Sequence, residues 1–254
     1  MKISERIIIW MDVLKSFIYT FFGIKANIVS SRETVNIILN ERKSLIRLGD
    51  GEFGIYRGKN IHYQCWSKQL ENEFIKIKKD YEMQEEKLNF LLAVPKRFMS
   101  IPGWILMKKR VYISSWAQSR YDYKKNWNHS ICYGDSFIFE KKNREIYKKI
   151  WSDDKTPKHI IFIHNNKKFA DLFETTYSKK VEFIKCPTQN AYEKINFLEK
   201  QVFEIIEKNN WDKNNVMIVV SAGPAGKVLI YHLCKKGIWG IDAGHCWDEP
   251  LEGV

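Results

Sequence analysis

The stretch NVMIVVSAGPAGKVLIYHLCKKGIWGIDAGH, residues 215–245, decides the fold. Residues 216–220 are an unbroken aliphatic run, which is typical of a strand that is covered on both faces. The turn 221–226 follows at once, and its Pro224 suits the first turn of a helix. Apolar residues at helical spacing predict that helix, which ends in the basic glycine stop at 235–237 before a second short strand. Such a unit forces a right-handed crossover between parallel strands.

Four further apolar runs end in acids, amides, histidines or glycines. Ligands bind beyond the carboxyl ends of the strands in open parallel sheets, so we expect these segments to face one crevice. The runs are 44–48 before Gly49-Asp50-Gly51-Glu52, 159–163 before His164-Asn165-Asn166, 181–184 before Cys186-Pro187-Thr188-Gln189-Asn190, and 238–241 before Asp242-Ala243-Gly244-His245.

Helical patterns alternate with the predicted strands. This alternation predicts an α/β fold, Rossmann-like, with a mostly parallel sheet and helices on both faces. Residues 90–94 are another strand candidate, whereas residues 99–151 are mixed, aromatic and basic, and only 141–151 among them shows a helical pattern. Without an internal repeat or a linker, we expect one domain, residues 29–254, after an N-terminal amphipathic helix within residues 1–28. The predicted helices cover a segment after the capping box at Ser30 to Glu33, then 68–89, 141–151, 167–177 and 191–209.

The 254-residue chain is basic, with a formal net charge of +12. This charge would attract phosphate-bearing partners such as nucleotide sugars, nucleic acid or an anionic membrane, although a solvated basic surface is the plainer reading. The five cysteines are scattered and form no CxxC pair. They indicate neither a zinc site nor a disulfide framework, and a reducing cytoplasm is the simplest location.

Residues 1–24 carry an apolar stripe interrupted by Asp12 and Lys15. The interruptions and the missing cleavage site argue against a signal peptide or a membrane span. Basic residues near the edges would let this helix lie on an anionic membrane, at the inner face of the cell membrane. Packing on the domain or on a second subunit is the alternative.

Asp50 and Glu52 place two carboxylates in a glycine turn after a predicted strand, with Arg47 just upstream. Side chains two residues apart in an extended segment point to one side. Carboxylate oxygens suit Mg²⁺ or Mn²⁺, which are typically shared with substrate phosphates. We therefore predict a divalent metal site at Asp50 and Glu52; acids that merely form the turn are the alternative.

The Gly-Pro-Ala-Gly turn offers backbone N–H groups at a helix N-terminus, which form a natural anion cradle. It is not a P-loop, because two residues separate its glycines and Val228 follows Lys227, and GxGxxG is absent. We expect Gly223, Pro224, Gly226 and Lys227 to bind a diphosphate. A close-packed turn without a ligand is the alternative.

His245 stands in a glycine turn after the last predicted strand, where it can contact a diphosphate or accept a proton. Asp248 and Glu249 are alternative bases. Asn190 is expected to cap the helix that follows it, and a ligand contact is compatible with that role. The other histidines show no ligand-like spacing, and we assign them no chemistry: His62, His129, His159, His164 and His232.

Together these blocks resemble the GT-D type glycosyltransferases, long labelled a domain of unknown function. The resemblance spans about residues 45–248, and the blocks appear in the family's order. It rests on RLGDGEF at 47–53, Tyr63-Gln64, YGDSF at 133–137, CPTQNAY at 186–192, Gly223-Pro224-Ala225 and IDAGH at 241–245.

The resemblance implies a Rossmann-like GT-D fold in which Asp50 and Glu52 hold a divalent metal against the diphosphate of a nucleotide sugar, usually UDP-linked. It implies transfer of that sugar to a glycan acceptor in surface polysaccharide or glycoprotein assembly. Donor or acceptor contacts are expected from Arg47, Gln64, Ser136 and Asn190, together with the glycine turn, Lys227 and His245.

Two other functions stay open on the sequence alone. One is an inactive relative that serves as a partner of another glycosyltransferase. The other is a nucleic-acid-binding module, indicated by interleaved Trp, Tyr and Lys residues between 104 and 151. Nucleic acid is not the expected partner, because no recognised RNA or DNA motif is present and the acidic turn would repel phosphate unless it held a metal.

Overall fold

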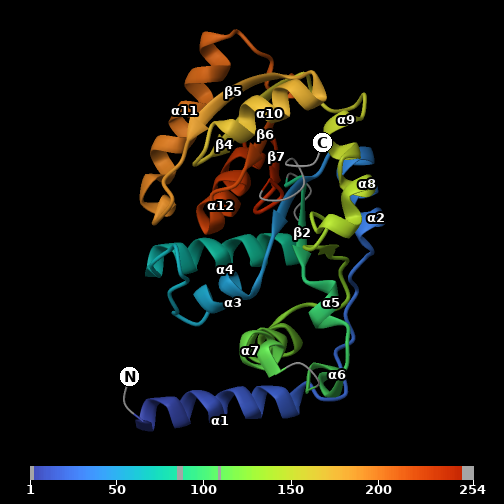
Figure 1. Ribbon diagram of the computed structural model, residues 1–254, viewed down its shortest axis with the longest axis vertical. Helices are drawn as coiled ribbons and strands as arrows, with labels where there is room; N and C mark the ends of the chain where they lie inside the picture. The colour runs from blue at the N-terminus through green and yellow to red at the C-terminus, as the bar shows by residue number, and fades with distance from the viewer. Residues whose placement is uncertain (1–2, 85–87, 108–109, 248–254) are drawn as a thin grey trace.

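The computed structural model describes residues 3–84, 88–107 and 110–247, and these form a seven-stranded sheet in the order β3-β2-β1-β7-β6-β4-β5 (Figure 1). Neighbouring strands in this sheet are parallel, so the predicted α/β fold is confirmed. The strands are β1 (Ser44–Arg47), β2 (Phe90–Val94), β3 (Gly134–Asp135), β4 (His159–His164), β5 (Lys180–Lys185), β6 (Val216–Val220) and β7 (Trp239–Asp242).

The strand-turn-helix-strand unit that was predicted from residues 215–245 is confirmed. Every residue of β6 is fully buried, which explains its unbroken aliphatic sequence. Helix α12 (Gly223–Cys234) follows, with Pro224 in its first turn, and leads to β7, which pairs with β6. A Cβ atom at Gly226 would lie 3.1 Å from the Val220 side chain, so this glycine lets α12 approach the sheet closely.

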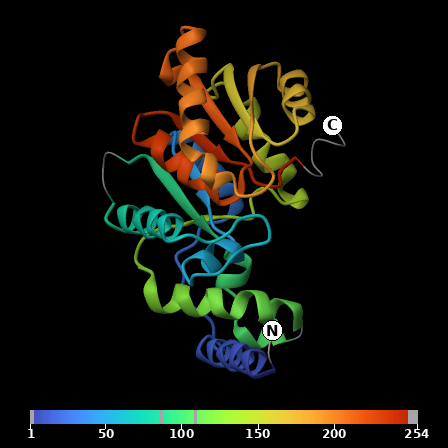
Figure 2. The same ribbon diagram turned by 90° about the vertical axis from the view of Figure 1, so that its left-hand side faces the viewer.

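Helices cover both faces of the sheet, as predicted (Figures 1 and 2). On one face α12 contacts α4 and α11, and on the other α2 contacts α8 and α9, while α9 meets α10 through Trp151 and Phe173. The capping box at Ser30 and Glu33 is present at the start of α2. The bounds are α2 (Ser31–Asn40), α4 (Lys68–Glu82), α8 (Arg144–Tyr147), α9 (Lys149–Ser152), α10 (Lys168–Tyr177) and α11 (Ile195–Lys208).

Some predicted helices differ in extent. The helix predicted at 68–89 ends at Glu82, and the helix predicted at 141–151 is divided into η1 (Lys141–Asn143), α8 and α9. The helix predicted at 191–209 begins as the 3-10 turn η2 (Ala191–Lys194) before α11. A further 3-10 turn, η3 (Lys213–Asn215), precedes β6.

Helix α7 (Arg110–Asn126) was not predicted, because apart from Ala117 the buried residues described in it are aromatic or polar. Arg120 in α7 is fully buried and donates hydrogen bonds to the carbonyl oxygens of Thr20, at 3.0 Å, and Phe98. Burial lowers the pKa of Arg120 to about 10. The guanidinium therefore joins α7 to the end of α1 and to α5 (Lys96–Met99).

Helix α1 (Ile3–Tyr19) lies within the predicted N-terminal helix and packs on α7, where Val13 and Phe17 cluster with Ala117. Helix α6 (Gly103–Met107) also contacts α7, and the three helices form one end of the molecule in both views (Figures 1 and 2). Within residues 3–247 as described, no helix is both long and apolar enough to span a bilayer. The boundary at residue 28 stays a prediction.

The aromatic residues between 104 and 151 mostly belong to the core. Rings that bind single-stranded nucleic acid must be exposed, because bases stack on them. Those buried here are Trp116, Tyr123, Trp127, Tyr133, Tyr147 and Trp151. The feature on which the nucleic-acid alternative depended is therefore a packing feature.

Candidate active site

A cavity of about 880 Å³ opens at the carboxyl ends of β1, β4, β5, β6 and β7. Its lining includes residues that follow each of these strands, so the expected convergence on one crevice is confirmed. Gln118 and Ser119 of α7 also line it, which places the unpredicted helix beside the cavity. Of the predicted site residues, the lining includes Arg47, Asp50, Glu52, Gln64, Ser136, Gly223, Lys227 and His245.

Asp50 and Glu52 are not in an extended segment, contrary to the prediction. They lie in the first turn of α3 (Asp50–Ile55), where successive side chains are about 100° apart and residues two apart diverge. The buried Glu52 turns back, and its Oε2 accepts a hydrogen bond from the Gly49 N–H at 2.7 Å. A capping box has two hydrogen bonds, and Gly49 can take part only in this one because it has no side chain. The bond explains why Asp50-Gly51-Glu52 begins a helix here.

Asp50 faces the cavity, and its Oδ1 accepts a hydrogen bond from the Gly51 N–H at 3.0 Å. The residue exposes much of its surface, yet enough protein surrounds it that burial raises the pKa of its carboxyl group. The Gly51 hydrogen bond opposes this rise, and the nearby charge of Glu52 adds to it. A cation bound at Asp50 would relieve both unfavourable effects on the carboxylate.

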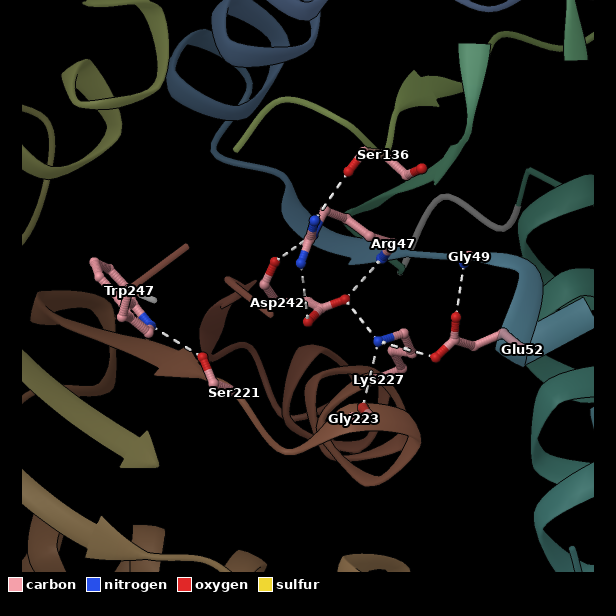
Figure 3. Close-up of polar contacts among 9 residues, drawn as sticks. All are labelled: Arg47, Gly49, Glu52, Ser136, Ser221, Gly223, Lys227, Asp242 and Trp247. Carbon is pink, nitrogen blue, oxygen red and sulfur yellow. Dashed lines mark hydrogen bonds and ion pairs between the residues drawn. The ribbon is translucent and has the colours of Figure 1, made fainter. Parts of the chain in front are cut away.

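Lys227 is buried between two carboxylates (Figure 3) and lines the cavity. Its Nζ is 3.1 Å from Asp242 Oδ2 and 3.3 Å from Glu52 Oε1, and it donates a hydrogen bond to the Gly223 carbonyl at 3.3 Å. Burial by itself lowers the pKa of Lys227, but the charges of Asp242 and Glu52 outweigh it and raise the pKa overall. Lys227 is therefore charged, and protein groups already share that charge.

Arg47 lies on the other side of Asp242 (Figure 3). Its Nε donates a hydrogen bond to the Asp242 carbonyl at 2.7 Å, and its Nη1 donates to the Ser136 carbonyl at 2.9 Å. The guanidinium stacks over the Phe139 ring, 4.9 Å from its centroid. Arg47 thus joins β1 to β7 and to the segment after β3, and Ser136 contributes a backbone oxygen to this brace.

The bend at Gly244 positions His245. Gly244 has φ +51°, and a Cβ atom there would lie 2.0 Å from Arg47 Nη2, so no other residue fits without moving Arg47. The following His245 is exposed at the cavity wall. The alternative bases, Asp248 and Glu249, lie outside the described residues.

Tyr63 packs against the glycine turn at the start of α12. Gly223 has φ +55°, and a Cβ atom there would lie 2.5 Å from the Tyr63 ring. Burial, followed by the charge of Glu52, raises the pKa of Tyr63 and keeps its hydroxyl protonated. Tyr63 lines the cavity and can donate a hydrogen bond. Tyr63-Gln64 contributes to the family resemblance, but the sequence assigned Tyr63 no role in the site.

Gln64 and Asn190 hold the Tyr63 loop against η2. Gln64 Oε1 accepts from the Tyr192 N–H at 3.1 Å, and its Nε2 donates to the Cys65 carbonyl. Asn190 occupies the predicted N-cap position of η2, but its side chain makes no cap hydrogen bond, because its Oδ1 accepts from the Cys65 N–H at 2.8 Å. In the described part of the chain, Asn190, Pro224 and Gly226 do not line the cavity.

His164 and Asp242 were also missed as site residues. His164 is buried at the end of β4 and lines the cavity, and its Nδ1 accepts a hydrogen bond from the Asn166 N–H at 3.0 Å. Its spacing in the sequence showed no ligand pattern, because most of the other residues that line the cavity follow different strands and are distant along the chain. Asp242 ends a predicted strand, but nothing in the sequence indicates that it pairs with Lys227.

The donor set decides how a divalent metal would fit. Among the residues that the structure describes, no group of three or more His, Cys, Asp or Glu side chains could hold a metal ion. Asp50 is open to the cavity, whereas Glu52 is held by Gly49 and Lys227. Mg²⁺ and Mn²⁺ commonly use one or two carboxylates and complete their coordination with substrate phosphates. The residues therefore fit a metal shared with a phosphate-bearing ligand and do not fit a closed protein site.

Known proteins share this fold. Solved structures that are similar include a new glycosyltransferase (DUF1792) from Streptococcus sanguinis, with 21% identity, a TM-score of 0.66, and coverage of 88% of this chain and 83% of that one. A second, described as domain of unknown function 1792 with a distinct glycosyltransferase fold, has 20% identity, a TM-score of 0.65, and coverage of 95% and 83%. At this identity the likeness shows the fold.

Curated relatives carry glycosyltransferase names. Glycosyltransferase GlyD of Streptococcus pneumoniae serotype 4 (strain ATCC BAA-334 / TIGR4) is 27% identical over 240 residues, which cover 85% of this chain and 26% of GlyD. The probable glycosyl transferase Gly of Streptococcus gordonii is 23% identical over 242 residues, covering 88% and 32%. The chain thus spans about a quarter to a third of the relatives it matches.

The family model described as "Glycosyltransferase GT-D fold" matches residues 45–250, which include every lining strand end and the predicted site residues. The match covers most of the chain. The chain therefore belongs to the GT-D glycosyltransferase family.

Proposed function

We propose that this protein is a metal-dependent glycosyltransferase that transfers a sugar from a nucleotide-sugar donor, UDP-linked, to a glycan acceptor. The observation that carries the proposal is one cavity that joins an acidic helix start at Asp50 to the glycine turn of α12 at Gly223. A diphosphate needs positive charge and N–H donors on one side and a cation on the other. Family membership supports the reaction class.

In this proposal, Asp50 and Glu52 hold the divalent metal together with the donor diphosphate. The metal, when bound, neutralises negative charge that develops on the departing diphosphate. Glu52 is near enough to Asp50 for its charge to raise the Asp50 pKa, and both residues line the cavity. Since Lys227 contacts Glu52 at 3.3 Å, a metal at Glu52 competes with this ion pair.

The N-terminus of α12 faces the same cavity through Ser221, Ala222 and Gly223. Backbone N–H groups and the helix dipole favour an anion at such a terminus. Gly223 has positive φ, and the Tyr63 ring packs against it, so these two residues limit the space through which a ligand reaches the N-terminus of α12. We assign the diphosphate to this end, with Lys227, which lines the cavity, supplying positive charge.

His245 is the proposed proton acceptor or diphosphate contact. It lies at the cavity wall after β7. An acceptor hydroxyl must lose a proton as the new glycosidic bond forms, and a positioned histidine can take it. The acceptor is proposed to be a glycan in surface polysaccharide or glycoprotein assembly, reached from the cytoplasmic side. Association with a second copy or with another glycosyltransferase is part of the same proposal.

A thermal-shift panel of nucleotide sugars, each with and without Mn²⁺, tests the proposal. A ligand that binds only the folded state raises the free energy of unfolding by RT ln(1 + L/Kd), where L is the free ligand concentration. We expect one UDP-sugar to raise the melting temperature only when Mn²⁺ is present, and expect no such shift for Asp50→Asn. If no nucleotide sugar shifts the protein under either condition, the proposed donor class is wrong. A shift of equal size without metal would reject the metal role.

A further inference from the structure

Helix α1 carries two apolar stripes, and only one of them is covered. Val13 and Phe17 are buried against α7. On another side of the helix, the residues Ile7, Met11, Leu14 and Ile18 are 54%, 65%, 57% and 63% exposed. At helical geometry these four positions span about 60° of the circumference, so they form one continuous stripe.

Helix α6 adds an exposed aromatic residue at the same end of the molecule. The Gly103 N–H donates a hydrogen bond to the Phe21 carbonyl at 2.8 Å, and a Cβ atom at Gly103 would lie 2.9 Å from Phe21 Cα. This close approach sets Trp104, which is 45% exposed, beside the end of α1, where Phe22 is 91% exposed. We call Ile7, Met11, Leu14, Ile18, Phe22 and Trp104 the apolar end face.

We propose that the apolar end face docks the protein on an anionic lipid membrane. Contiguous apolar surface on a soluble domain marks an interaction site. Here α1 lies along the outer end of the molecule in both views, so a flat surface can approach it (Figures 1 and 2). Helices that lie in a membrane interface combine such an apolar stripe with basic residues on the adjoining sides.

Charge selects a lipid surface over a second copy of the chain. Lys15, next to Leu14 in α1, and Lys25, in the segment after α1, are exposed. Lys124 donates a hydrogen bond to the Tyr19 carbonyl at 2.8 Å and lies over the Tyr19 ring. The whole chain carries +12. Pairing two copies through this face would bring these lysines together, whereas anionic headgroups attract each of them.

The docking face is tied to the cavity by ion pairs. Arg57, which follows α3 and lines the cavity, lies 3.2 Å from Asp12 of α1 and also pairs with Asp122 of α7. Gln118 of α7 lines the cavity as well and contacts both Asp12 and Lys59. Docking would therefore hold the cavity in a defined orientation to the membrane. Lipid binding itself does not depend on the proposed reaction.

Vesicle flotation tests the docking. The protein is mixed with vesicles of phosphatidylcholine alone or with an added fraction of phosphatidylglycerol. The wild type is expected to float with the anionic vesicles and to be released by salt. Met11→Ser with Leu14→Ser and Ile18→Ser is expected to weaken partitioning on the order of a hundredfold, because three apolar side chains no longer enter the interface.

A matched triple variant uses apolar residues elsewhere that are 45%, 61% and 53% exposed: Ile75→Ser with Met83→Ser and Phe197→Ser. This control is expected to float as the wild type does. Lys15→Glu with Lys25→Glu is expected to reduce flotation on anionic vesicles only. Circular dichroism and the donor-induced thermal shift of each variant report the fold and the donor site separately from lipid binding.

Three outcomes would overturn the docking. They are a wild type that stays unbound on anionic vesicles, an α1 triple variant that floats unchanged, and a control triple that loses binding equally. Light scattering adds a fourth: a wild-type dimer that the α1 substitutions dissociate would assign the face to a second copy.

Discussion

Lys227 Nζ lies 3.1 Å from Asp242 Oδ2, so an ion pair joins α12 to β7 beneath the candidate active site. The pair belongs to a larger group, since Lys227 also contacts Glu52, and Arg47 Nη2 lies 3.7 Å from Asp242 Oδ1. Two cations and two carboxylates thus come together from α3, α12, β1 and β7. Because each cation lies beside a carboxylate, the ion pairs offset the cost of removing these four charges from water.

Lys227→Met leaves Glu52 and Asp242 without their shared cation. Removing one partner from a buried ion pair costs about 3–5 kcal/mol, so we expect a loss of that size in the free energy of unfolding. Urea unfolding at neutral pH measures it. Lys167→Met, which breaks an exposed pair with Asp171, is the control and should change stability by less than about 1 kcal/mol. Equal effects from both variants would contradict the structural role of Lys227.

The same pair predicts a pH dependence. The pKa of Lys227 is raised in the folded protein above its ordinary value of 10.5. A lysine with a raised folded pKa contributes stability fully below its unfolded pKa and loses it as the pH rises through the folded pKa. The stability difference between wild type and Lys227→Met should therefore stay constant from neutral pH up to about 10.5 and shrink above it. A difference that already shrinks between neutral pH and about 10.5 would contradict the assignment.

Asp50→Asn is expected to reduce sugar transfer by about 10²–10³-fold while the fold persists, because the variant loses a charged metal ligand. Its stability should move the other way. The pKa of Asp50 is raised, so its ionised form disfavours folding above the folded pKa, and this penalty vanishes as the pH falls below the unfolded pKa. At neutral pH the variant should be at least as stable as the wild type, and at acid pH the two should converge.

Transfer assays and thermal unfolding of Asp50→Asn, with Asp154→Asn as an exposed acid away from the cavity, separate these effects. Retained transfer in Asp50→Asn would remove Asp50 from the reaction.

Gly244→Ala combines backbone strain with a collision. Strain at positive φ costs about 1–2 kcal/mol for a non-glycine residue, and the added methyl would also displace Arg47. Gly237→Ala is a matched control, since Gly237 has φ +76° and an added Cβ would meet nothing within 4 Å. We expect Gly244→Ala to lose about 1–3 kcal/mol more than the control, the usual range for overpacking. Equal losses in urea unfolding would show that Arg47 moves freely.

His245→Gln should lower the turnover number by about 10²–10³-fold, because the imidazole is proposed to take the proton from the hydroxyl group of the acceptor glycan. Because His245 is exposed, stability should stay within about 0.5 kcal/mol. His62→Gln is the matched control, since His62 is also exposed and lines the same cavity. Steady-state kinetics at saturating donor compares the two, and equal turnover in both would assign the proton to another group.

Several elements were predictable because their cause is local. The buried runs at β2 and β6 are apolar at every position, and the helix after Pro224 has its start and stop signals in the sequence. Helix α7 was not, because its buried face uses Arg120 and aromatic residues whose burial depends on partners in α1 and α5. The extended conformation predicted for Asp50 and Glu52 was wrong for a similar reason. Glu52 accepts a hydrogen bond from Gly49 and pairs with Lys227, and both contacts accompany the helical turn.

The sequence by itself determined the parallel α/β architecture, because apolar periodicity is a property of neighbouring residues and alternating strands and helices make the strands parallel. It also determined that the polar residues after these strands converge on one cavity. Only the tertiary structure decided which of those polar groups meet. Lys227, Asp242, Glu52 and Arg47 come from four elements, and their contacts depend on how α12 packs on the sheet. Electrostatic pairing acts over a few ångströms in space, and linear spacing along the chain does not encode that distance.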